Sequence, residues 1–434
     1  MLSGSIELVV RLDFVVYWLS MRVIADLHIH SRFSRSCSKD LTLPNIGLYG
    51  VRKGIQYIGT GDALHPVWRR EIGDLLEERE GAFYLKNSDC PTAFCLTTEV
   101  SCIYKRGDKT RRVHHVLLFP DLITLDKVTQ ALSDRGFNLK SDGRPIMGLD
   151  SELLLKMLLD IDERILLIPA HIWTPWFAVF GSKSGFDSLE ECFGDYAQYI
   201  YALETGLSSD PLMNWRISAL DKIFLVSNSD AHSCENLGRE ANVFEMDKPS
   251  YHELRRILLE HDQSKFIETI EFFPEEGKYH ADGHADCGYW CAPDATKKNK
   301  GLCPKCGRPL TVGVLSRVSD LADRPPNPDR PPGAVPFKSI VPLKELVAQC
   351  RGKSKASKVV QREVEKMMSL ASEFAILLDL DAQALASVAE PDIARAVLMM
   401  RQGKVDTRPG YDGVYGEIKV DVGSGGLKQS GLFE

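Results

Sequence analysis

Seven strand-like segments of this chain each carry a histidine or a carboxylate at or near their end, and this serial pattern constrains the fold more than any other feature. In chain order the polar residues are Asp26-Leu27-His28-Ile29-His30, Asp62, Glu99, His115, His171, Glu204 and Asp230-Ala231-His232. Stretches of helical length separate the segments, so the pattern predicts an α/β fold of parallel strands joined by helical crossovers. In a barrel of this kind the carboxyl ends of the strands face one another, and barrel enzymes have their active sites there.

The spacing of two pairs makes a metal site the best explanation. Side chains alternate along a strand, so His28 and His30 share a face, and so do Asp230 and His232. Two such pairs, with single ligands between them, offer more donors than one tetrahedral zinc ion uses. A lone histidine at a strand end is more often a satisfied polar residue, and only the ordered set indicates a metal. We expect a hydrolytic centre with two or three divalent metals, for which zinc, manganese, magnesium and iron are all suitable.

The composition excludes a disordered or membrane protein, because 44% of the 434 residues are hydrophobic and 26% are charged. This length allows two or more domains with a large core. Residues 6–19 are apolar but too short to span a bilayer, and Arg11 and Asp13 interrupt them. Eleven cysteines without a secretion signal indicate a reducing compartment. We expect a cytoplasmic, nucleoid-associated protein with no membrane partner.

Changes in composition along the chain predict five regions. A proline-rich connector at residues 325–336 follows the cysteine-containing region and precedes a sequence with a helical pattern. The regions are 1–21, a non-native extension; 22–275, the catalytic domain; 276–336, a zinc-binding module with the connector; 337–420, a helical domain; and 421–434, a flexible tail.

Four cysteines in a Gly/Lys-rich stretch predict a structural zinc site. Cys303-Pro304-Lys305-Cys306-Gly307 has the form of a zinc knuckle, and Cys287-x3-Cys291 supplies two further thiols. The spacing His284-x2-Cys287 also fits a knuckle, so His284 is the alternative to Cys291 as the fourth ligand.

The charge is distributed unevenly. Residues 281–370 carry 16 lysine and arginine residues against 9 aspartate and glutamate residues, in a chain of net charge −7. A basic middle region suits a DNA-guiding module beside a carboxylate-rich metal site. The excess of positive charge in residues 281–370 is equally compatible with a solvated helix face that binds no DNA.

The motifs resemble those of the polymerase and histidinol phosphatase (PHP) superfamily, and within it the endonuclease Q family. The resemblance covers about residues 22–420 and rests on a series of short motifs: His28-x-His30, Thr60-Gly61-Asp62, Glu99, His115, Pro169-Ala170-His171, Asp230-Ala231-His232 and Pro409-Gly410-Tyr411-Asp412-Gly413. It implies a PHP-type distorted (β/α)7 barrel with a zinc-binding insert and a helical C-terminal region. It also implies a metal-dependent enzyme that nicks damaged DNA 5′ of deaminated bases (uracil, hypoxanthine, xanthine) or abasic sites.

The resemblance also implies which residues form the site. The implied metal ligands are His28, His30, Asp62, Glu99, His115, His171, Asp230 and His232, and the implied catalytic residues are Asp230, His232, Glu99 and His171. Asp62 is favoured over the nearby His65, and His115 over the adjacent His114, whereas Asp40 is only a weak candidate for a third-metal ligand.

Two further sets of residues are candidates for binding substrate and partner. Trp173, Trp176 and Phe177 directly follow His171 and could line a pocket for an extruded base or act as a wedge, although loop aromatics are more often local core. Gln429, Leu432 and Phe433 have the Gln-x-x-Leu-Phe form that resembles a bacterial sliding-clamp-binding peptide, after a Gly/Ser-rich tether.

A second function fits the same catalytic domain. A PHP-family phosphatase acting on a small phosphorylated metabolite would need the same metal ligands, but the basic insert and the tail would have no role in it. A DNA adaptor with a degenerate site and a proofreading exonuclease are weaker alternatives. The near-complete ligand set disfavours the adaptor, since clustered charges without metal are costly to bury.

Overall fold

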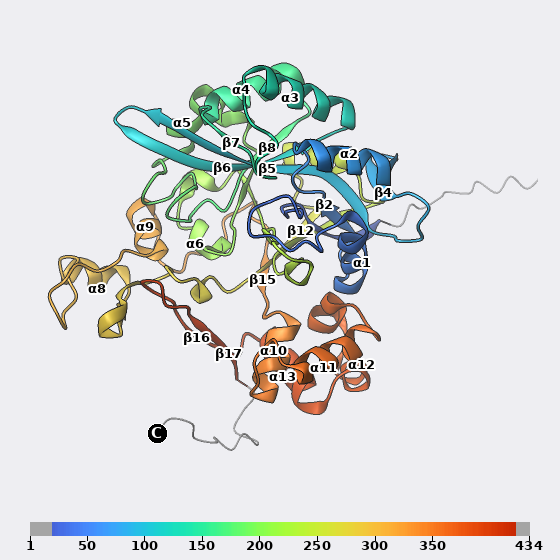
Figure 1. Ribbon diagram of the computed structural model, residues 1–434. Helices are drawn as coiled ribbons and strands as arrows, with labels where there is room; N and C mark the ends of the chain where they lie inside the picture. The colour runs from blue at the N-terminus through green and yellow to red at the C-terminus, as the bar shows by residue number, and fades with distance from the viewer. Residues whose placement is uncertain (1–19, 422–434) are drawn as a thin grey trace, which may run out of the picture.

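Residues 20–421 are described by a computed structural model, and within them a large mixed sheet forms the centre of an α/β structure (Figure 1). Eight of its strands follow one another in hydrogen-bonded order: β15 (Phe337–Ser339), β12 (Phe266–Glu271), β11 (Ala241–Met246), β1 (Met21–Asp26), β2 (Tyr57–Gly59), β5 (Ala93–Arg106), β4 (Ala82–Leu85) and β3 (Leu76–Arg79). Three more complete the sheet: β6 (Lys109–Phe119) and β7 (Ile146–Met147) pair with β5, and β8 (Leu166–Pro169) pairs with β6. The predicted α/β class is confirmed.

The prediction that these strands are all parallel is wrong for part of the sheet. β1, β2 and β5 do pair in parallel, as do β9 (Ala202–Glu204) and β10 (Phe224–Val226), which form a ladder of their own. β6, however, is antiparallel to β5 and to β8. Only Gly107 and Asp108 separate β5 from β6, and a two-residue loop can join only antiparallel strands. The closed barrel stays a prediction.

Helices connect the strands and cover the sheet (Figure 1). Their starts carry recognisable signals: Pro66 at the first turn of α2, and the Asp121 and Asp150 side chains, which accept N–H donors at the starts of α3 and α4. The helices of this region are α1 (Leu43–Lys53), α2 (Pro66–Leu75), α3 (Leu122–Asp134), α4 (Ser151–Ile161), α5 (Leu189–Phe193), α6 (Pro211–Asn214) and α7 (Tyr251–Leu259).

The strands are buried on both faces, which explains their nearly continuous apolar sequence. In β1, Ile24 belongs to a cluster that includes residues of α1 to α4, whereas Val23 and Ala25 belong to a second cluster on the opposite face. The second cluster gathers residues from most strands, among them Val116 of β6 and Phe224 of β10, together with Tyr251 and Leu254 of α7. Rigid strands packed on two sides give the polar residues at their ends a fixed position.

The remaining described residues form an insert and a group of C-terminal helices (Figure 1). The insert holds β13 (Asp282–His284), β14 (Tyr289–Cys291), α8 (Pro293–Lys298) and α9 (Val314–Leu321), and the helices are α10 (Leu343–Arg351), α11 (Lys358–Met368), α12 (Ala382–Val388) and α13 (Pro391–Arg401). A two-stranded ribbon, β16 (Val405–Arg408) and β17 (Glu417–Val420), runs between them in Figure 1. The predicted domain boundaries are untested and stay predictions.

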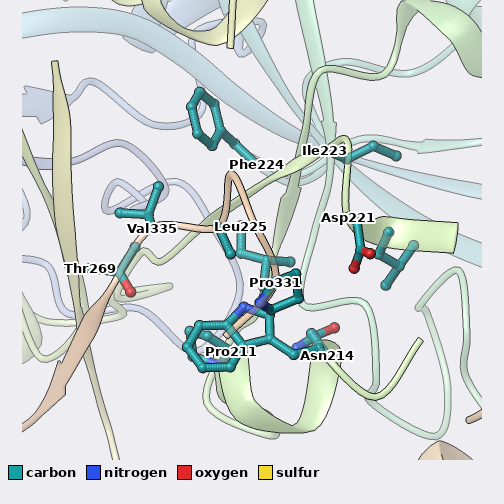
Figure 2. A pocket seen from close by; sticks show the side chains of 12 residues that line it. Pro211, Asn214, Asp221, Ile223, Phe224, Leu225, Thr269, Pro331 and Val335 are labelled. Carbon is teal, nitrogen blue, oxygen red and sulfur yellow. The ribbon is translucent and has the colours of Figure 1, made fainter. Parts of the chain in front are cut away.

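The proline-rich connector packs against the sheet-bearing region. Pro331 and Val335 enclose a cavity of about 20 Å³ together with Phe224 and Pro211 (Figure 2). That volume suits about one water molecule. The cavity is therefore a packing defect under the connector and too small for a substrate. Within residues 20–421, moreover, every helix is too short or too polar to cross a bilayer.

Gly59 of β2 is predicted to tolerate no side chain. A Cβ atom there would lie 2.5 Å from the Leu27 carbonyl oxygen and 2.5 Å from Thr97 Oγ1. Gly59→Ala should therefore lower the free energy of unfolding by about 1–3 kcal/mol, the usual cost of overpacking. The matched control is Gly73→Ala in α2, where a Cβ meets only the flexible end of Arg69. Alanine favours a helix over glycine, so this control should be neutral or stabilising. Denaturant unfolding of both variants checks the difference, and equal effects would contradict the strand packing.

Candidate metal centre

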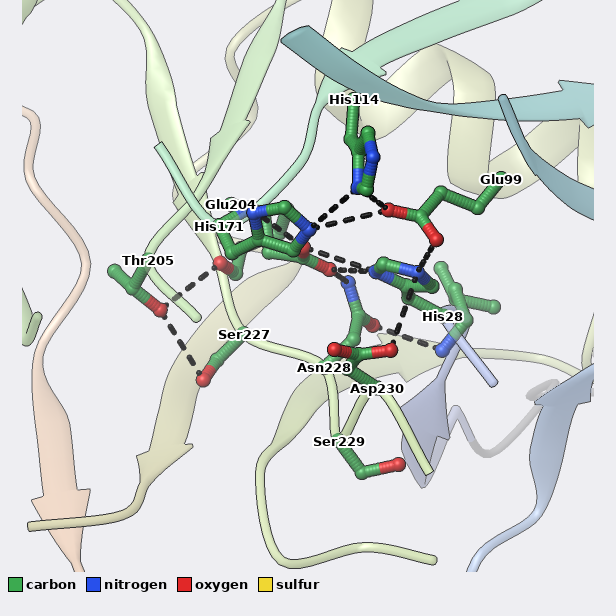
Figure 3. Close-up of polar contacts among 12 residues, drawn as sticks. His28, Glu99, His114, His171, Glu204, Thr205, Ser227, Asn228, Ser229 and Asp230 are labelled. Atoms are coloured by element: carbon green, nitrogen blue, oxygen red, sulfur yellow. Dashed lines mark hydrogen bonds and ion pairs between the residues drawn. The ribbon is translucent and has the colours of Figure 1, made fainter. Parts of the chain in front are cut away.

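The strand ends bring the predicted ligands together (Figure 3). His28 and His30 follow β1, His171 follows β8, Glu204 ends β9, Asp230 follows β10, and Glu99 lies within β5. The segments after β1 and β10 run side by side, because Ile29 and Ala231 form a parallel bridge and the His30 N–H donates to the Ala231 carbonyl at 3.0 Å. The two ligand pairs that share a strand face are thus adjacent in space.

One group of possible ligands consists of His28, His30, Glu99 and Asp230, whose ligand atoms all lie within 4.8 Å of one another. His30 Nε2 lies 3.0 Å from Asp230 Oδ1 and 3.3 Å from Glu99 Oε2. His28 Nε2 lies 3.7 Å from each of the same two oxygens. Two imidazole nitrogens and two carboxylate oxygens therefore surround one small volume.

This group fits a divalent cation. His28 Nε2 is buried and has no hydrogen-bond partner within the described residues, while Nδ1 of the same ring contacts Glu204 at 3.0 Å. An imidazole held at one nitrogen by a carboxylate, with the other nitrogen free, is the usual arrangement of a metal-binding histidine. Burial disfavours the charged ring, yet Glu204 and Glu99 raise the pKa of His28 well above its ordinary value. The surrounding carboxylates therefore favour a positive charge in this volume, which a divalent cation would supply in place of the proton on His28.

A second group consists of Glu99, His114 and His171. His114 Nδ1 lies 2.5 Å from Glu99 Oε1, and His171 Nε2 lies 3.1 Å from the same oxygen. The two imidazole nitrogens are 3.3 Å apart (Figure 3). Glu99 belongs to both groups: Oε1 faces the second group and Oε2 the first. A carboxylate shared in this way suits two neighbouring metal ions.

The presence of His114 corrects the prediction of His115. The β5–β6 register pairs Ser101 with His114 and Val100 with His115. Residues directly opposite in an antiparallel pair share a face, and Glu99 shares a face with Ser101, so Glu99 and His114 lie together. His115 points away, where Nε2 contacts Ser151 Oγ at 2.9 Å and the ring packs near Phe193.

The protonation states of Glu99 and His114 match those of metal ligands. Burial alone would raise the pKa of Glu99, but electrostatic attraction to His114 and hydrogen bonds from the surrounding imidazoles hold the Glu99 pKa well below its ordinary value. Burial lowers the pKa of His114 to about 4 despite the pull of Glu99. At neutral pH the carboxylate is therefore ionised and the His114 ring neutral, as metal coordination requires.

Two further carboxylates orient the ligands. Glu204 accepts the His171 backbone N–H at 2.8 Å and the Asn228 side-chain N–H at 2.9 Å, besides contacting His28 (Figure 3). Asp62 was predicted as a ligand, but its oxygens contact His30 Nδ1 at 3.1 Å and accept bonds from Ser31 and Ser34. Neither Asp62 oxygen belongs to the two ligand groups. We therefore revise the role of Asp62 to holding His30.

Unusual backbone conformations accompany these side chains. Asp62, His171 and Asp230 have φ angles of 49°, 29° and 47°. Residues other than glycine rarely adopt positive φ, and such strain persists where the surroundings fix it. Under His171 the fixing residue is Gly206, at which a Cβ atom would lie 2.5 Å from the His171 Cβ.

The other predicted residues lie outside the two groups. His232 stands beside them, with its ring centre 4.6 Å from that of His30 and its Nδ1 2.9 Å from the Asp230 carbonyl oxygen. His65 stacks on Phe33 and contacts the Lys140 carbonyl, which leaves it away from the ligands. Asp40 is exposed and accepts a bond from Ser38. Neither His65 nor Asp40 reaches the centre.

The three predicted aromatic residues have different environments. Trp173 is buried and donates its Nε1–H to Asn214 Oδ1 at 2.7 Å, so it belongs to the core. The Phe177 ring packs 4.6 Å from the His114 ring. Trp176 is 45% exposed beside them and is the one of the three whose side chain is largely open to solvent.

Comparison with known proteins identifies the family. The structure superposes on the lesion-specific endonuclease PfuEndoQ from Pyrococcus furiosus with a TM-score of 0.81 and 34% sequence identity, over 92% of this chain and 96% of that chain. The chain belongs to the endonuclease Q family. A second endonuclease Q structure, in complex with a 27-mer duplex substrate with an abasic lesion at the active site, matches with a TM-score of 0.80 and 33% identity. That match covers 95% of this chain and all of the other.

Further matches come from sequence. The family model of the MJ0043 C-terminal domain matches residues 342–404, which span α10 to α13. The uncharacterized protein MJ0043 of Methanocaldococcus jannaschii is 31% identical over 256 residues, or 57% of this chain. This match covers 31% of the length of MJ0043, so the chain spans about a third of that relative.

The insert of this endonuclease Q family member contains a separate group of possible metal ligands. His284, Cys287, Cys303 and Cys306 place one ligand atom each within 4.8 Å of the others. The knuckle turn is formed as predicted, because the Gly307 N–H donates to the Cys303 carbonyl at 2.8 Å and Gly307 has a φ of 72°. Three thiols and an imidazole fit a structural zinc ion.

Cys291, preferred over His284 from the sequence, lies outside this group. Cys291 is buried in β14, and its Sγ lies 3.2 Å from Thr296 Oγ1, in a small apolar cluster with Leu310. The β13–β14 register instead pairs His284 with Tyr289 and Cys291 with Asp282. His284 is therefore the fourth possible ligand.

Sequence reasoning considered His114 at the metal centre but preferred His115, and it did not bring out Arg144. His114 could have been found from the Gly107-Asp108 turn, which fixes the hairpin register and thus the shared face with Glu99. Arg144, whose Nη1 lies 3.0 Å from Glu99 Oε2, lies in an irregular segment before β7 with no local signal.

The geometry of the insert predicts which thiols retain zinc. Cys287→Ser should remove about one equivalent of bound zinc, since loss of one of four ligands opens a structural site. Cys291→Ser, the matched control at the thiol outside the group, should retain it. Elemental analysis of the purified proteins measures the content. Zinc loss in the Cys291 variant as well as in the Cys287 variant would instead support the four-cysteine site.

Proposed function

We propose that this protein is a metal-dependent DNA repair endonuclease that hydrolyses the phosphodiester 5′ of a deaminated base or an abasic site. The supporting observation is the pair of ligand groups joined by Glu99 in a chain that matches endonuclease Q over nearly its full length. In the matching complex the duplex carries an abasic lesion at the active site. We further propose a PHP-type barrel for residues 22–275.

The ligand groups define what each residue does in this reaction. His28, His30, Glu99 and Asp230 would hold one divalent ion, and Glu99, His114 and His171 another. Bound divalent ions supply an activated water and charge neutralisation at phosphorus. Water adds to phosphorus and the bond to the 3′ oxygen breaks, leaving a 3′-hydroxyl and a 5′-phosphate.

A hydrogen bond to the backbone fixes which nitrogen of His232 carries the proton. Its Nδ1–H donates to the Asp230 carbonyl oxygen at 2.9 Å, which leaves the lone pair on Nε2. Burial lowers the pKa of His232, so the ring is neutral near pH 7. The His232 side chain is about a third exposed (32%), at the open side of the centre. The predicted role of His232 as a further ligand requires such a free nitrogen.

Trp176 is the candidate for contacting the lesion. It is the exposed aromatic residue of the loop after His171, and extruded bases commonly stack on aromatic side chains. The buried position of Trp173 removes it from this role, and Phe177 supports His114 instead.

The proposed clamp peptide, Gln429, Leu432 and Phe433, lies outside the described residues, as does most of the predicted extension 1–21. Both stay predictions from the sequence.

Asp230→Asn should abolish nicking of a labelled duplex with one abasic site in the presence of manganese. Loss of an anionic ligand should cost at least about 10³-fold in rate, whereas duplex affinity, set mainly by other phosphate contacts, should change less than about threefold. Gel-resolved nicking and fluorescence anisotropy measure the two quantities.

The control for this substitution is Asp40→Asn, the same change at the exposed candidate that the structure places outside the ligand groups. It should leave nicking unchanged. Full nicking by the Asp230 variant would contradict the ligand set. Absent nicking by the wild type, with fast turnover of p-nitrophenyl phosphate, would favour the phosphatase.

A further inference from the structure

Arg144 stands at the open side of the metal centre, and nothing above gives it a function. Its Nη1 donates to Glu99 Oε2 at 3.0 Å, and its side chain is 27% exposed, whereas that of Glu99 is fully buried. The Asp230 side chain has the same exposure and interacts electrostatically with Arg144. Arg144 therefore reaches from solvent to the carboxylate that both ligand groups share.

The backbone on both sides of Arg144 is fixed. The Arg144 N–H donates to Asp142 Oδ1 at 3.2 Å, and the Ser101 N–H donates to the Pro145 carbonyl at 3.0 Å. Gly143 donates to the Phe33 carbonyl and lies so close to Asp62 that a Cβ atom there would meet Asp62 Oδ2 at 2.2 Å. The segment that carries Arg144 thus packs directly against the same Asp62 that orients His30.

The guanidinium group has unused donors. A guanidinium carries five N–H donors in a planar fork. Within residues 20–421, Glu99 is the one group that accepts a hydrogen bond from the Arg144 side chain, and it does so through Nη1. The nearby Arg239 differs, because its guanidinium donates to the Ser229 and Asp230 carbonyls and so supports the backbone.

We infer that Arg144 binds a non-bridging oxygen of the phosphate that is cleaved. This inference rests on the proposed function. The centre offers the carboxylates of Glu99 and Asp230, which repel an anionic diester, and Arg144 places a permanent positive charge beside them at the open side. Guanidinium groups match phosphate oxygens in geometry and form strong charge-assisted hydrogen bonds. A donor placed where charge develops contributes mainly to the rate of reaction.

Steady-state nicking of the abasic duplex by the full-length protein tests this inference with Arg144→Ala, Arg144→Lys and the control Arg35→Ala. Arg35 is 84% exposed on a neighbouring segment and lies 3.9 Å from Asp142. Arg144→Ala should lower kcat about 100-fold, a typical effect of removing one donor at developing charge. Duplex affinity should stay near the wild-type value, and Arg35→Ala should nick normally.

Chemical rescue separates a phosphate contact from a structural role. Millimolar ethylguanidinium should raise the nicking rate of Arg144→Ala at least tenfold. It should leave the nicking rates of the wild type and of Arg35→Ala unchanged. Arg144→Lys, which keeps the charge but has no planar fork, should retain intermediate activity. If Arg144→Ala unfolds, the Arg144→Lys rate decides: an intermediate value supports the inference, and an unchanged value overturns it.

The outcomes also distinguish the two proposals. A wild type that does not nick overturns the proposed function and this inference together. A wild type that nicks, with a folded Arg144→Ala variant that is fully active or that guanidinium does not rescue, overturns the inference alone.

Discussion

The structure of the centre depends on one buried carboxylate, that of Glu99. Its Oε1 contacts His114 and His171, and its Oε2 contacts His30 and the Arg144 guanidinium. A fully buried carboxylate is stable only when positive or hydrogen-bonding groups surround it. Four cationic or polar side chains from four separate segments must therefore converge on β5, and that convergence defines where metal and phosphate can bind.

The fold supplies the rigidity that this convergence needs. Strands packed on both faces end in ligands, while Asp62, His171 and Asp230 adopt strained backbone angles that the surrounding contacts hold in place. Close approaches at Gly143 and Gly206 lock the loops under Asp62 and His171. Strain of this kind concentrates at functional sites, because the geometry of the site takes precedence over local backbone preference.

The sequence predicted the α/β class and brought out His28, His30, Glu99, His171 and Asp230, which the structure places together, because period-two alternation and strand-end position are local signals. It failed where the answer depended on pairing between strands. The choice between His114 and His115 depends on the β5–β6 register, and that between His284 and Cys291 on the β13–β14 register. Asp62 was misassigned because its hydrogen bonds to His30, Ser31 and Ser34 are tertiary contacts.

The most direct test of the centre is anomalous X-ray diffraction from crystals of the full-length protein soaked in manganese. Two ions that share Glu99 should give two anomalous peaks, one among His28, His30, Glu99 and Asp230 and the other among Glu99, His114 and His171. A centre in which Glu99 contacts no ion, or in which His115 replaces His114 as a ligand, would contradict this account.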